Sequence, residues 1–176
     1  MKITRYLVFA VALATLFSIS ALGQTKRPVR RTAPARAATL PPLEVRAARV
    51  KVDNQLTNVS LFVKNFGPVA QALDALEAES KTKKHSEQTI AKNAKDKQKV
   101  VTAIRNLREG MVKLESEFRV KAGLKKYLPT LQGISTLAGQ SEDSAVAGKF
   151  VAANAPLRTI QQKLTDTLAA MPNAEL

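Results

Sequence analysis

The chain has 176 residues, of which 45% are hydrophobic, with seven Gly, eight Pro, no Cys and no Trp. Its 28 Lys and Arg residues outnumber its 14 Asp and Glu residues, which leaves a net charge of +14. This composition excludes disulfide-stabilised scaffolds and cysteine-based metal sites, and it is typical of a helical protein rather than of a β-sandwich or barrel.

The first 23 residues have the layout of a secretory signal peptide. Lys2 and Arg5 precede an uncharged apolar run over 7–17. The small residues Ala21 and Gly23 occupy the third-last and last positions of the predicted leader, which predicts cleavage between Gly23 and Gln24. The run is shorter than the roughly 20 residues of a spanning helix. The basic residues beyond it would resist export, so an uncleaved N-terminal membrane anchor is the alternative. Removal of the leader, with its two basic residues and no acid, lowers the net charge from +14 to +12.

The absence of Cys also bears on where the protein resides. An exported chain without Cys has no disulfide bonds, and small secreted eukaryotic domains usually depend on them. We therefore expect a periplasmic or secreted bacterial protein.

Residues 24–42 form a basic segment that is rich in Pro and Ala. It contains four Pro and no acid, and its five basic residues are Lys26, Arg27, Arg30, Arg31 and Arg36. This composition cannot bury a core and predicts a disordered or extended linker. Two interpretations stay open: an electrostatic arm that contacts anionic partners, and a solvated spacer.

The first helical segment is predicted over 43–78, because Pro41 and Pro42 suit a helix start. Gly67-Pro68 predicts a kink or a tight turn within it. The polar stretch 77–89 predicts the turn to the next helix, with Ser86 as its N-cap. Apolar residues recur along the segment at helical spacing: Leu56, Val59, Phe62, Val63, Phe66, Val69, Ala72, Leu73 and Leu76.

The clearest predicted element is a long helix over 86–128. Its apolar residues alternate spacings of four and three, which is a heptad seam: Val100, Ile104, Leu107, Met111, Leu114 and Phe118. This pattern predicts either the intramolecular core of a bundle or a coiled coil with another chain.

Five of the basic residues between 77 and 121 are predicted to form ion pairs with a Glu four positions before them. The predicted pairs are Glu77–Lys81, Glu79–Lys83, Glu109–Lys113, Glu115–Arg119 and Glu117–Lys121. Lys92, Lys95 and Lys99 share one helix face with only Asp96 nearby. Together with the five basic residues of the arm, these three lysines are the candidate residues for binding an anionic partner.

A third segment is predicted over 130–171, after Pro129 ends the long helix. Gly133 and Gly139 weaken it, Ser141 is the predicted N-cap of a further helix with Glu142 in its first turn, and 154–156 interrupts the chain again. The last apolar stripe comprises Leu157, Ile160, Leu164, Leu168 and Met171.

Segments of similar span joined by short turns predict an all-α fold. We expect residues 43–176 to form one domain, an elongated antiparallel helical bundle of three long helical segments, some of them kinked. A squatter four-helix bundle, made by folding at Gly67-Pro68 or within 139–156, is the alternative.

Catalytic chemistry finds little support in the sequence. His85 is the only His, and the chain has no Cys, so zinc, haem and di-iron sites lack their usual ligands. His85 lies in a Lys-rich polar stretch, where we expect it to be exposed. Glycine-rich phosphate loops are absent. We therefore predict a protein that is not an enzyme and has no catalytic, cofactor-binding or metal-binding residues and no cofactor.

The sequence thus predicts a non-enzymatic helical interaction protein of the bacterial cell envelope. Its basic surfaces would contact anionic envelope components or acidic proteins, with peripheral membrane contact included. Nucleic acid is not the expected partner, because exported proteins seldom meet it and aromatic residues for base stacking are scarce. The alternative is a coiled-coil assembly, including a homo-oligomer, or a chaperone-like protein that acts through apolar helix faces. A small apolar ligand between the helices is a third option that no residue specifies.

Overall fold

The structure is a computed structural model, and it describes residues 40–173. The predicted leader, its cleavage site and the basic arm up to residue 39 lie outside the described residues. The elements in chain order are α1 (Leu43–Ser80), α2 (Glu87–Val120), the 3-10 helix η1 (Ala122–Tyr127), α3 (Leu128–Leu131), α4 (Ile134–Val146) and α5 (Phe150–Ala170). Residues 40–173 contain no strand, which confirms the all-α prediction.

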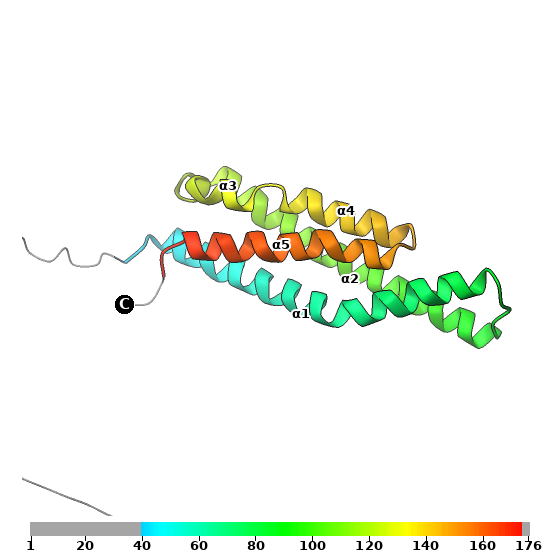
Figure 1. Ribbon diagram of the computed structural model, residues 1–176. Coiled ribbons are helices and arrows are strands. Elements are labelled where there is room, and N and C mark those ends of the chain that lie inside the picture. The colour runs from blue at the N-terminus through cyan, green and yellow to red at the C-terminus, as the bar shows by residue number, and fades with distance from the viewer. Residues whose placement is uncertain (1–39, 174–176) are drawn as a thin grey trace, which may run out of the picture. The chain divides into compact units, whose positions relative to one another are not determined.

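The four longer helices pack side by side as a bundle (Figure 1). Helix α5 packs against both α1 and α4, and α4 packs against α2. None of the helices within 40–173 combines the length and the apolar character that crossing a membrane requires.

The third predicted segment, 130–171, is divided into separate helices in the structure. Helix α4 ends at Val146, the chain turns, and α5 runs back along α4 from Phe150 (Figure 1). Gly148 allows this turn, because its φ of 73° lies in the left-handed region that favours glycine. The turn falls within 139–156, where the four-helix alternative placed a fold.

Two prolines lie inside helices instead of ending them. Helix α1 continues through Pro68, and Figure 1 shows it changing direction about midway, so the predicted kink fits better than the predicted tight turn. Helix α5 continues through Pro156, and the predicted interruption at 154–156 is wrong. Burial of the neighbouring side chains of Phe66 and Ala70 in α1, and of Leu157 in α5, offsets the hydrogen bond that each proline removes.

The predicted end of the long helix at Pro129 is also wrong. Helix α2 ends at Val120, because Lys121 adopts an extended conformation, and the chain then continues as η1 and α3. Pro129 lies in the first turn of α3, a position where its missing N–H costs nothing.

The heptad seam of α2 is part of the intramolecular core. Five of its residues are buried and Leu107 is partly buried against them; the buried five are Val100, Ile104, Met111, Leu114 and Phe118. The core interpretation is therefore confirmed. In this fold the other helices of the bundle cover the seam, so another chain could pair with it only if the bundle opened.

One predicted N-cap forms and the other does not. Ser86 caps α2, since its Oγ accepts a hydrogen bond from the N–H of Thr89 at 3.3 Å. Ser141 instead lies buried inside α4 and donates to the carbonyl oxygen of Ala153 at 2.7 Å. The N-terminus of α4 is capped from α2, where Glu115 accepts hydrogen bonds from the N–H groups of Gly133 and Ser135 at 3.1 and 3.0 Å.

Candidate functional site: a cationic two-helix tip

Helices α1 and α2 extend past the turn between α4 and α5 as a two-helix hairpin (Figure 1). We call residues 74–99 the tip hairpin. None of these residues is buried, and the last buried side chains before it are Leu73 on α1 and Val100 on α2. The tip hairpin is thus a surface feature on both of its faces.

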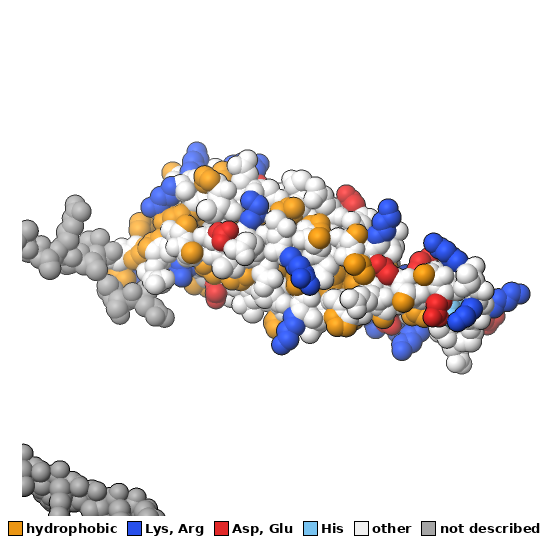
Figure 2. Space-filling model, in the orientation of Figure 1, with side chains coloured by type: hydrophobic (Ala, Val, Ile, Leu, Met, Phe, Trp, Pro, Cys, Tyr) orange, Lys and Arg blue, Asp and Glu red, His pale blue; other side chains and the backbone are white. Residues whose placement is uncertain are grey.

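Lysines dominate the surface of the tip hairpin. It carries seven Lys, six of them exposed, against five acidic residues, and Figure 2 shows blue side chains at this end of the bundle with red ones among them. Asp74 bonds to the N-terminus of α5, Glu77 pairs with Lys97, and Asp96 pairs with Lys99. Five lysines have no carboxylate partner within 4.0 Å among the described residues: Lys81, Lys83, Lys84, Lys92 and Lys95.

The structure places three of the predicted binding residues on this hairpin. Lys92, Lys95 and Lys99 are exposed on α2, and the Nζ of Lys99 lies 3.2 Å from a carboxylate oxygen of Asp96. The other predicted residues lie outside the described part of the chain: Lys26, Arg27, Arg30, Arg31 and Arg36.

Sequence reasoning missed the lysines at the hairpin turn. It assigned Lys81 to an ion pair with Glu77, but Glu77 pairs across the hairpin with Lys97 instead. The hydrogen bond from Lys97 lowers the pKa of Glu77, and the charge of Lys97 acts in the same direction. The run of Lys81, Lys83 and Lys84 within the polar stretch 77–89 was the available signal, although three Glu in the same stretch balance its charge.

A groove of about 620 Å³ lies between the two helices at the base of the tip hairpin, and we call it the tip groove. Its α1 wall is apolar: Val69, Ala72, Leu73 and Leu76. Its α2 wall is mixed and includes two lysines: Thr89, Lys92, Asn93, Asp96, Lys99 and Val100. The groove therefore combines an apolar wall with positive charge along one edge.

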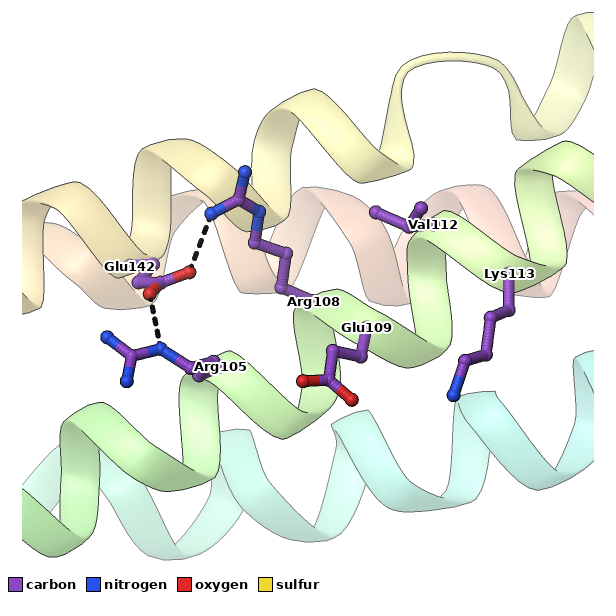
Figure 3. Close-up of a pocket in the computed structure, with 6 residues that line it drawn as sticks. All are labelled: Arg105, Arg108, Glu109, Val112, Lys113 and Glu142. Atoms are coloured by element: carbon purple, nitrogen blue, oxygen red, sulfur yellow. Dashed lines mark hydrogen bonds and ion pairs between the residues drawn. The ribbon is translucent and has the colours of Figure 1, made fainter.

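A second hollow of about 380 Å³ borders a charged cluster between α2 and α4 (Figure 3). Glu142, predicted as a first-turn charge, is instead almost buried in α4 with 9% of its side chain exposed. It accepts hydrogen bonds from Arg105 Nε at 2.8 Å and Arg108 Nη1 at 2.9 Å. Glu109 and Lys113 extend from α2 on a side away from this cluster (Figure 3).

The charged cluster ties α2 to α4 and offers no acid–base pair. Hydrogen bonds from Arg108 and Arg105 lower the pKa of Glu142, and the bond to Glu142 raises the pKa of Arg108. Both partners therefore keep their charge near neutral pH, and neither can exchange a proton there. This arrangement is typical of a structural ion pair rather than of a general acid or base.

The single histidine lies at the tip hairpin. His85 is partly buried rather than exposed, and its Nε2 is buried without a hydrogen-bond partner among the described residues. Within residues 40–173, no group of three His, Asp or Glu side chains is placed to hold a metal ion.

The chain matches no family model, and no curated protein or solved structure is significantly similar to it.

Proposed function

We propose that this protein is a non-enzymatic helical interaction protein of the bacterial cell envelope that contacts anionic partners through basic surfaces. The observation that carries the proposal is the distribution of charge on the tip hairpin. Five of its lysines have no carboxylate partner among the described residues, and of its five acids Asp74, Glu77 and Asp96 are engaged in contacts within the bundle, which leaves five lysines against Glu79 and Glu87.

The mechanism is charge neutralisation at an exposed surface. Long, flexible lysine side chains on a two-helix projection reach an anionic surface without rearrangement of the core. Each basic residue near an anionic membrane contributes about 1 kcal/mol, so five lysines support reversible attachment. Attachment of this kind weakens as salt rises, because ions screen charges separated by more than about 8 Å at physiological ionic strength.

The basic arm adds to this surface in the proposal. Its five basic residues lie within residues 24–42, whose composition predicts an extended segment. We further propose that the N-terminal apolar run directs export and is cleaved after Gly23, which would leave the arm at the new N-terminus. The arm and the tip hairpin would then contact anionic partners independently of each other.

Co-sedimentation with anionic phospholipid vesicles tests the proposal, using the chain from Gln24 onward at low and high salt. Binding should fade with salt, and it should weaken in a variant without residues 24–42. It should also weaken when the five unpaired lysines are changed to Gln: Lys81, Lys83, Lys84, Lys92 and Lys95.

A matched control separates location from total charge. Changing five exposed lysines outside the tip hairpin to Gln removes the same charge: Lys64, Lys113, Lys125, Lys126 and Lys149. This control should bind more tightly than the tip variant. Equal loss in both variants would mean that only net charge matters, and salt-independent binding or no binding would contradict the proposal.

The chaperone-like alternative remains a second candidate because the tip groove leaves apolar surface uncovered. In that case the protein would act through the groove, since the heptad seam is buried. A mass that rises with concentration would favour the assembly form of this alternative.

A further inference from the structure

We infer that the tip groove binds an acidic amphipathic helix of another protein, an inference that rests on the proposed function and names the partner class. The α1 wall has the spacing of a helix-docking surface. Val69, Ala72, Leu73 and Leu76 stand at positions i, i+3, i+4 and i+7, which places them on one side of α1. They form a continuous apolar wall, and an amphipathic helix with its own apolar anchors at this spacing is the kind of ligand that docks in such a groove.

The α2 wall runs alongside with the same periodicity. Its lining residues extend from Thr89 to Val100, which corresponds to about 16 Å of helix and about three turns. No residue of α4 or α5 lines the groove, so the bundle itself supplies no third helix at this place. A helix of three or more turns would complete the packing that α1 and α2 leave open.

The shape of the groove favours a helix over a membrane surface. Val69 is 42% exposed, whereas Leu73, at the bottom of the same wall, is only 4% exposed. A ridge of side chains that enters the groove can contact both the exposed Val69 and the recessed Leu73, whereas a flat surface can contact only the exposed part of this wall. A ridge of side chains on one face of an α-helix has this form.

The charge at the edge selects an acidic partner. Lys92, Asp96 and Lys99 line the groove. Asp96 pairs with Lys99, which leaves Lys92 and the neighbouring Lys95, on the same face of α2, without a carboxylate partner among the described residues. The chain's own arm is basic, and a second copy of the tip hairpin would bring further lysines. Both would meet like charge, whereas Asp and Glu beside an apolar stripe would meet opposite charge.

Binding of designed peptides tests the inference. The probe is a fluorescent peptide of about 18 residues with a Leu stripe at helical spacing and Glu on both flanks. One control peptide replaces Leu with Ser and Gln at the same charge, and another replaces Glu with Lys. The acidic amphipathic peptide should bind the chain from Gln24 onward by fluorescence anisotropy, and both controls should bind more weakly.

A pair of variants locates the binding. Val69→Asp places a charge on the apolar wall and should weaken binding about tenfold. Leu61→Asp is the matched control, since Leu61 is 55% exposed on the same helix outside the groove, and it should leave binding unchanged. Circular dichroism during heating checks that both variants remain folded.

Chemical protection gives an independent readout, because the chain has no native Cys. Ala72→Cys lies in the groove and should react with maleimide more slowly when the acidic peptide is present. Ala152→Cys, exposed on α5, should react at an unchanged rate.

Two outcomes would overturn the inference. Equal binding of the polar acidic peptide would show that lysine charge alone acts, which retains the proposed function but removes the groove. Vesicle binding that depends on Val69, without binding of the peptide, would assign the groove to lipid instead. If the Lys variants lose vesicle binding, that result tests the proposed function. The peptide experiments then decide separately whether the groove binds a helix.

Discussion

Arg49 and Asp74 lie on the same helix, α1, and contact opposite ends of α5. The two carboxylate oxygens of Asp74 accept hydrogen bonds from the N–H groups of Phe150 and Val151 at 2.9 and 3.0 Å. Arg49 Nη1 donates to the carbonyl oxygen of Met171 at 2.9 Å. An anion at the N-terminus and a cation at the C-terminus both have the sign that stabilises a helix. Helix α1 therefore contributes a stabilising charge at each end of α5.

Replacement of Asp74 by Ala should lower the free energy of unfolding by about 1–2 kcal/mol, the usual cost of a lost helix N-cap. The N-cap residue of α5, Lys149, makes no side-chain cap of its own, so nothing local replaces Asp74. Urea denaturation measures the loss. Asp53→Ala is the control, because Asp53 is exposed on the same helix. Equal losses in both variants would show that the contact with α5 adds nothing.

Glu115→Gln should destabilise the fold by about 1–3 kcal/mol, the cost of leaving buried donors without their acceptor. Beyond the two backbone N–H groups at the start of α4, Glu115 accepts from Ser135 Oγ at 2.6 Å and Arg119 Nη2 at 2.9 Å. Thermal and urea unfolding measure the effect. Glu109→Gln, an exposed change on the same helix, should cost little, and a Glu115→Gln protein as stable as the wild type would show that the negative charge and the second acceptor oxygen of Glu115 are not needed.

Acid should destabilise the bundle through Glu115 and Glu142. Burial raises the pKa of Glu115, but bonds from Ser135 and Gly133 and the charge of Arg119 outweigh it and leave the pKa below the usual 4.5. Bonds from Arg108 and Arg105 lower the pKa of Glu142. Because the unfolded chain then binds protons first, the stabilisation is complete above about pH 4.5 and is lost as the pH falls through the lowered values.

Urea denaturation between pH 7 and pH 3 checks this dependence. The free energy of unfolding should fall below about pH 4.5 in the wild-type chain. The double variant Glu115→Gln, Glu142→Gln should begin less stable and change less with pH. An equally steep decline in the double variant would assign the acid sensitivity to other carboxylates, such as Glu77 and Glu117, whose pKa values are also lowered.

Amide protons of the tip hairpin should exchange faster than those in the middle of the bundle. No residue from 74 to 99 is buried, whereas α2 buries five seam residues from Val100 to Phe118. Segments with few buried apolar contacts open locally at low free energy. Hydrogen exchange followed by mass spectrometry measures this, and equal protection along the whole of α2 would show that the hairpin is as stable as the core.

Gly148→Ala should destabilise the turn between α4 and α5 by about 1–2 kcal/mol, because a side chain disfavours the left-handed region where φ is 73°. Gly139→Ala is the matched change within α4, where a methyl group would meet only Arg108 Nε at 3.9 Å. It should be neutral or stabilise the helix by about 0.5–1 kcal/mol. Opposite signs in thermal unfolding would confirm the role of Gly148; equal effects would contradict it.

Most of the correct sequence predictions were based on the helical periodicity of apolar residues. The seam from Val100 to Phe118 and the stripe from Leu157 to Met171 lie in the core or against it, because residues three and four apart share one face of a helix. Predictions of helix ends from proline were less accurate. Pro68 kinks α1, which was one of its two predicted outcomes, but the predicted interruption at Pro156 is wrong, since tertiary packing can offset one lost hydrogen bond.

The sequence by itself determined the helical class, the core faces and the excess of positive charge. Only the tertiary structure decided which charges remain free. Asp74 finds its partner 76 residues away, and Glu142 finds Arg105 37 residues away, so neither contact has a local signature. Because a carboxylate is engaged by whichever donors the packing of the helices brings near it, the fold assigns Asp74 to a cap and Glu142 to an ion pair, and it leaves six lysines of the tip hairpin exposed together with Glu79 and Glu87.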